Sequence, residues 1–163
     1  MIVRLLGFVA SLAVALIGLG LEWIAFPGLE LSASGFETLT LANAFILVLG
    51  LGVFVVFYFK GLAQRILASF LTVVAGYTAF ISANSLLNSS PIIDRLVSVT
   101  GAIGQNPEYS FNSISIAVYF IGLLGYLAFS SFTLFRPVQT KASKRITKNT
   151  DDDDPIGIWD EQS

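Results

Sequence analysis

Residues 41–59, LANAFILVLGLGVFVVFYF, indicate the fold class of this chain, because they run for 19 positions without a charged side chain. A helix of that length rises about 28 Å at about 1.5 Å per residue, and the hydrocarbon core of a bilayer is about 30 Å thick. An uncharged apolar run of about 18 residues or more is typical of a transmembrane helix. The stretch therefore predicts a helix that crosses a membrane.

Two further stretches share this character, at residues 66–87 and 113–135, and a third runs from residue 5 to 21 and extends to residue 26 if Glu22 and Trp23 lie at the membrane boundary. The whole sequence is 55% apolar and only 12% charged, whereas a soluble domain carries about 25% charged residues. A soluble α/β core is a poor alternative, since it would not hold four apolar runs of this length. We therefore expect an all-α integral membrane protein, with a four-transmembrane-helix bundle at residues 1–136 and a cytoplasmic tail at residues 137–163.

The first run has a second interpretation, which is a cleavable signal peptide. Arg4 would supply its positive end, and Ser32-Ala33-Ser34 loosely resembles a small-residue cleavage site. However, the apolar part is longer than the roughly 7 to 15 residues of a signal peptide. We favour a retained helix that reaches residue 26, with Trp23 in the interfacial belt of aromatic residues and Pro27-Gly28 as its stop.

The connections between the runs predict three local features. The connection at residues 60–65 is short, so the second and third runs should form an antiparallel hairpin. Asn88-Ser89-Ser90-Pro91 ends the third run with turn-forming residues. Residues 92–103 are apolar enough for a short helix on the membrane surface. Its expected buried face consists of Ile92, Ile93, Leu96, Val97 and Val99.

The positive charges predict the orientation of the chain. In a four-span arrangement eight of the nine Lys and Arg residues fall on one side of the membrane, and only Arg95 falls on the other. The eight are Arg4, Lys60, Arg65, Arg136, Lys141, Lys144, Arg145 and Lys148. Because cytoplasmic loops carry an excess of Lys and Arg, we expect a multi-pass protein of the plasma membrane with both termini in the cytoplasm.

The tail changes character along its length. Its basic part ends at Lys148, and four carboxylates at Asp151–Asp154 and the segment IGIWDE at residues 156–161 follow. The tail lacks a core-forming pattern, so we expect it to be disordered in isolation. Trp is enriched both in binding hot spots and at membrane interfaces, so the tail Trp either docks on a cytoplasmic protein or on the bundle itself, or rests on the bilayer. The candidate partner-docking residues are Ile158, Trp159 and Asp160.

Few residues offer chemistry. The chain has no Cys and no His, which excludes thiol nucleophiles, disulfides and the usual zinc ligands. Glu22 is the most membrane-embedded carboxylate and the candidate for an acid at the mouth of a transport pathway, although an ordinary interfacial Glu is the simpler interpretation. Asp151–Asp154 lack the spacing of a calcium loop. We assign no catalytic residue, cofactor or metal site, and we expect no nucleic-acid partner.

Polar and small residues inside the runs favour close helix packing. Polar side chains there could line a cavity, but they more commonly bond neighbouring helices. They are Asn43, Asn84, Tyr77, Tyr119 and Tyr126. Small residues let helix backbones approach closely, as in the pairs Ser11 with Ala15 and Gly122 with Gly125. Such pairs suit packing within the bundle or a homo-oligomer, and the sequence leaves both open.

The layout and three short motifs resemble one known family. Leu21-Glu22-Trp23 follows the first run, a short basic loop joins the second and third runs, and the tail ends DPIGIWDE at residues 154–161. In these features the chain resembles the tryptophan-biosynthesis-associated membrane proteins of actinobacteria, which have four predicted spans. The resemblance implies an association with tryptophan biosynthesis. The activity of that family is undefined, so no catalytic residue is carried over.

Two functional hypotheses follow from these observations. The first is a non-enzymatic accessory or scaffold protein whose cytoplasmic tail binds a protein partner, with the lipid bilayer as its surroundings. The second is a small transporter, or a transporter subunit, for an aromatic or apolar metabolite, which would need convergent polar groups near the bilayer midplane. We favour the first, because the sequence shows no paired groups that could perform catalysis or line such a site.

Overall fold

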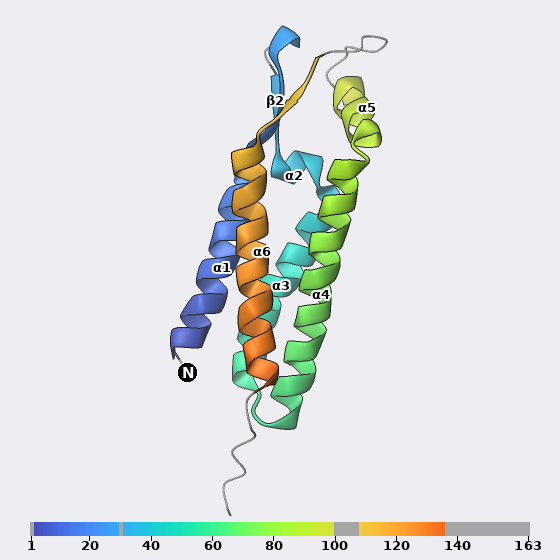
Figure 1. Cartoon of the computed structure of the whole chain (residues 1–163). Helices are drawn as coiled ribbons and strands as arrows, with labels where there is room; N and C mark the ends of the chain where they lie inside the picture. The colour runs from blue at the N-terminus through green and yellow to red at the C-terminus, as the bar shows by residue number, and fades with distance from the viewer. Residues whose placement is uncertain (1, 30, 100–107, 136–163) are drawn as a thin grey trace, which may run out of the picture.

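Four long helices dominate the computed structural model, which describes residues 2–29, 31–99 and 108–135 (Figure 1). They are α1 (Ile2–Gly20), α3 (Thr40–Tyr58), α4 (Leu62–Leu87) and α6 (Ser113–Leu134). Of these, α3, α4 and α6 are long and apolar enough to cross a membrane, and α1 is a shorter apolar helix when counted from Arg4. The tail, with Ile158, Trp159 and Asp160, lies outside the described residues.

The long helices form an up-down-up-down bundle (Figure 1). The last helix, α6, packs against both α1 and α4, and α3 packs against α4 and α1. Each helix is therefore antiparallel to both of its neighbours, in the ring order α1, α6, α4, α3. A tight turn joins α3 to α4, and Gly61 has a φ of 70° there, a conformation that glycine adopts without steric cost. The predicted hairpin is confirmed.

A small β-sheet caps the end of the bundle opposite this turn. It contains β1 (Glu22–Phe26), β2 (Leu31–Ser34) and β3 (Ser110–Phe111), all antiparallel, in the order β2-β1-β3. The 3₁₀ turn η1 (Pro27–Leu29) reverses the chain between β1 and β2. The prediction that the first helix reaches residue 26 is wrong, because the backbone of residues 22–26 pairs with two strands. Apolar composition alone does not separate a short strand from a helix end.

Two short helices complete the cap. Helix α2 (Gly35–Thr38) begins with a capping box, in which the Ser34 side chain accepts from the backbone N–H of Glu37 and the Glu37 carboxylate accepts from the N–H of Ser34. Helix α5 (Ser90–Val99) stands above the end of α4 (Figure 1). It begins at Ser90, inside the stretch of residues 88–91 predicted as a turn, and it confirms a short helix in this loop.

The predicted buried face of α5 is largely correct. Val97 is buried, and Ile92, Ile93 and Leu96 are partly buried against the core. Val99 is 81% exposed, so its assignment to that face is wrong. Two residues along a helix correspond to a rotation of about 200°, which turns Val99 away from the side that Val97 faces. Whether α5 lies on a membrane surface stays a prediction.

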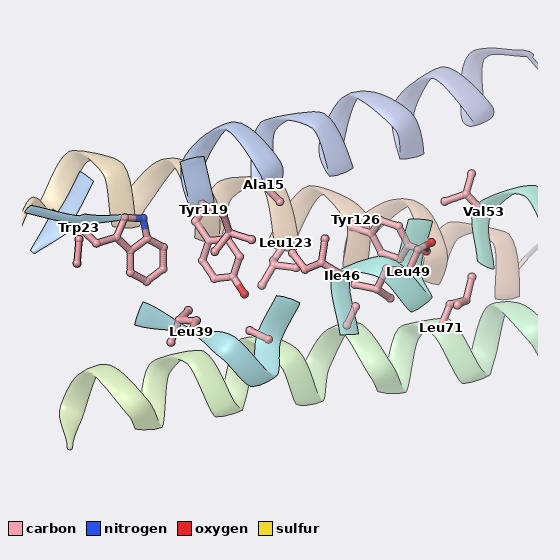
Figure 2. Close-up of a cluster of buried hydrophobic side chains, with 14 of the residues drawn as sticks. Ala15, Trp23, Leu39, Ile46, Leu49, Val53, Leu71, Tyr119, Leu123 and Tyr126 are labelled. Carbon is pink, nitrogen blue, oxygen red and sulfur yellow. Dashed lines mark hydrogen bonds between the residues drawn. The ribbon is translucent and has the colours of Figure 1, made fainter. Parts of the chain in front are cut away.

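The hydrophobic core follows the axis of the bundle from end to end. Figure 2 shows a row of buried side chains that starts with Trp23 at the capped end, passes Tyr119 and Tyr126, and reaches Val53 and Leu71 near the hairpin. All of the long helices and β1 contribute to this row. The cap is therefore part of the same packed body as the helices.

Candidate functional site

Hydroxyl groups inside the bundle bond across helices. The hydroxyls of Tyr119 and Ser82 lie 2.8 Å apart and link α6 to α4. The Tyr126 hydroxyl donates to the Leu49 carbonyl of α3 at 3.0 Å. In an apolar environment such groups need a partner in the protein, and a neighbouring helix is the usual one. At these two Tyr residues the interhelical interpretation is confirmed.

The other polar residues singled out in the sequence do not converge with these. Tyr77 is 52% exposed and packs edge-on against Phe45, with the ring centroids 5.5 Å apart. Asn84 is exposed and accepts from the Asn88 side chain at 3.1 Å. Asn43 lies at the cap, where its amide donates to the Phe36 carbonyl at 2.7 Å. The five candidates therefore do not line one common cavity.

The small residues of α1 and α6 face each other across a very close contact. A Cβ atom at Gly122 would lie 2.3 Å from the backbone nitrogen of Ala15, and one at Gly18 would lie 2.4 Å from the backbone nitrogen of Tyr119. A Cβ atom at Gly125 would lie 2.7 Å from the Ser11 hydroxyl oxygen. The small pairs noted in the sequence are therefore covered within a single chain, and the interpretation as bundle packing is correct for them.

Trp23 closes the capped end of the core. Its ring is 0% exposed, its Nε1 donates to the Gly18 carbonyl at 2.8 Å, and it packs against Tyr119 with the centroids 5.3 Å apart. Gly18 belongs to the last turn of α1, so its carbonyl lacks the usual donor four residues on, and besides the indole it accepts only a longer bond from the Leu21 N–H at 3.4 Å. Gly35 makes room for the ring, since a Cβ there would lie 2.7 Å from the indole. The prediction that Trp23 sits in an interfacial belt is wrong.

Glu22 lies on β1 and is exposed. It lines a pocket of about 290 Å³ between β1 and β3, together with Ile24, Ala25, Ser110, Phe111 and Asn112. Its carboxylate accepts a hydrogen bond from the Ser32 hydroxyl at 2.8 Å, across β1 and β2. Glu22 is the only charged residue in that lining. The role of Glu22 as an acid at the mouth of a transport pathway stays a prediction. The structure places this residue on a strand of the cap rather than on a helix.

A second hollow lies on the outside of the bundle, between α3 and α4, with a volume of about 260 Å³. We call it the hairpin groove. Its lining is wholly apolar and consists of Val48, Leu51, Gly52, Val55, Val56, Leu67, Phe70 and Leu71. A Cβ at Gly52 would lie 2.3 Å from the Leu71 side chain, so the glycine brings the two helices together beneath the groove. No pattern in the sequence indicates it, because the groove depends on which faces of α3 and α4 meet.

Arg95 has a structural position at the cap. Its guanidinium donates to the Thr40 hydroxyl at 2.8 Å and to the Glu37 carbonyl. These bonds tie α5 to the start of α3 and to α2. Arg95, which the charge pattern separates from the other Lys and Arg residues, thus connects α5 to α2 and α3.

Comparison with known proteins finds no relative for this chain: no protein-family model, curated protein or solved structure matches it. Within residues 2–29, 31–99 and 108–135, no group of three or more Asp, Glu, His or Cys side chains could hold a metal ion. The described residues offer three candidate sites. These are the buried hydroxyl groups that bond across helices, the Glu22 pocket and the hairpin groove.

Proposed function

We propose that this chain is an integral membrane protein whose four long helices all cross the bilayer, and that it acts as a non-enzymatic accessory or scaffold protein. The observation that carries the proposal is the distribution of polarity across the bundle. Its outer surface is apolar, while hydroxyl groups lie inside it and bond to one another and to the backbone.

The outer surface of the helices suits lipid. Leu51 and Phe54 of α3 are 71% and 70% exposed, and Phe132 of α6 is 70% exposed. Leaving apolar surface in water costs about 25 cal/mol per Å², and large contiguous apolar patches are rare on soluble monomers. Lipid chains remove that cost. The exposed face of the bundle therefore supports membrane insertion.

The first helix supports a fourth span. Helix α1 has 19 residues, so it rises about 28 Å, close to the hydrocarbon thickness of about 30 Å. It packs along α6, which is long and apolar enough to cross a membrane. A helix that packs along a membrane-spanning helix over most of its length lies at the same depth in the bilayer. We therefore infer that α1 crosses the bilayer too.

The proposed orientation places the α3–α4 turn in the cytoplasm. Lys60 and Arg65 flank this turn, and the start of α1 and the end of α6 lie toward the same end of the bundle (Figure 1). The positive-inside rule favours that end as cytoplasmic. The sheet and α5 then lie outside the cell, and a plasma-membrane location with both termini inside follows as part of the proposal.

A packed interior supports a scaffold over a transporter. Trp23, Tyr119 and Tyr126 fill the axis of the bundle (Figure 2), and their polar atoms already have partners. Transport sites usually need broken helices and polar groups that converge on a cavity near the midplane. We place the working surface in the tail instead, with Ile158, Trp159 and Asp160 docking on a cytoplasmic protein. By the resemblance of its layout, that partner belongs to tryptophan biosynthesis.

Single cysteines test the topology cleanly, because the chain has none of its own. In intact cells a membrane-impermeant maleimide should label Ser32→Cys at once. It should label Arg4→Cys and Lys60→Cys only after the cells are permeabilised. Labelling of Arg4→Cys in intact cells would contradict the fourth span, and a reversed pattern for Ser32→Cys and Lys60→Cys would contradict the orientation.

Crosslinking in the native membrane tests the scaffold role. The full chain, a version ending at Lys148 and the variant Trp159→Ala are purified after crosslinking, and Gln162→Ala serves as the control in the same tail. We expect specific cytoplasmic partners with the full chain and the control, and their loss with the other two. The same partner list for all four would contradict tail docking, and uptake assays with aromatic metabolites would then address the transporter alternative.

A further inference from the structure

We draw no further inference here: the strongest candidate, the hairpin groove on the outer side of α3 and α4, has a wholly apolar lining, and nothing in the structure shows what covers it.

Discussion

At the scale of single residues, the absence of a side chain is as important as its presence. Gly122 lets α6 touch the backbone of α1 at Ala15. Gly76 of α4 has no atom within 4 Å of where its Cβ would be. The two glycines look alike in the sequence, yet only the first is needed for close approach. Their difference comes from the faces that the helices present to one another.

Substitution of these glycines gives a matched pair. Gly122→Leu should force α1 and α6 apart and lower the free energy of unfolding by about 1–3 kcal/mol or more, the cost of overpacking. Gly76→Leu should leave stability unchanged or slightly raised, since Leu has the higher helix propensity. Thermal unfolding in detergent, followed by circular dichroism, measures both. Equal destabilisation would contradict the close α1–α6 contact.

The buried tyrosines hold helices by single hydrogen bonds. Tyr126→Phe removes the bond to the Leu49 carbonyl but keeps the ring. We expect a loss of about 0.6–2 kcal/mol in stability, as for other hydrogen bonds between membrane helices. Tyr77→Phe is the control, because the Tyr77 ring is half exposed on the outside of the bundle. Unfolding curves in the same detergent would disprove the bond's contribution if the two variants were equally stable.

At the scale of elements, the cap is built from pieces that hydropathy does not distinguish. Residues 22–26 continue the apolar run of α1, but they form a strand because η1 turns the chain back and β2 and β3 supply partners on both sides. Trp23 is then carried into the core rather than to an interface. The short helix α5 is held near its middle by Arg95, which reaches across to α2 and α3.

Loss of the Arg95 bonds should release α5 locally. Arg95→Gln removes the bidentate donor to Thr40 and to the Glu37 carbonyl. We expect faster amide hydrogen exchange over residues 90–99, with exchange in α3, α4 and α6 unchanged, because local opening costs less than global unfolding. Asp94→Asn, at the neighbouring exposed position, is the control and should leave exchange as it was. Unchanged exchange in Arg95→Gln would contradict the anchoring role.

At the scale of the whole molecule, the ring order of the helices joins the two ends of the described chain. The first helix packs on the last, through Ser11, Ala15 and Gly18 against Tyr119, Gly122 and Gly125. The α3–α4 hairpin completes the ring from the other side (Figure 1). This arrangement leaves one face of the hairpin open to the surroundings, and the groove lies on that face.

A disulfide crosslink tests this arrangement directly. A Cβ at Gly125 would lie 3.3 Å from the Ser11 Cβ, near the range of about 3.5–4.5 Å found in disulfides. Mild oxidation of the Ser11→Cys, Gly125→Cys double variant should therefore produce an intramolecular bridge that shifts its mobility on a denaturing gel. Ser11→Cys combined with Gly76→Cys should not crosslink within the chain. The absence of a bridge in the first pair would contradict the packing of α1 on α6.

The sequence by itself determined the helices and the class of surroundings that suit them. Uncharged runs long enough to span a bilayer predicted α3, α4 and α6 to within a few residues, and the turn residues 60–65 and 88–91 predicted where they end. Such features are local, because helix length, charge and turn chemistry act within a few residues of the chain. The same locality explains why Tyr119 and Tyr126 could be assigned to helix packing before their partners were known.

Only the tertiary structure decided the features that join distant residues. Strand β1 needs its partners β2 and β3, Trp23 needs the gap left by Gly35, and the groove needs α3 and α4 to meet at Gly52 and Leu71. None of these is encoded within one run of apolar residues, because each depends on which face of an element turns toward another. The hairpin groove therefore emerges from packing, whereas the two helices that form it were already visible as apolar runs.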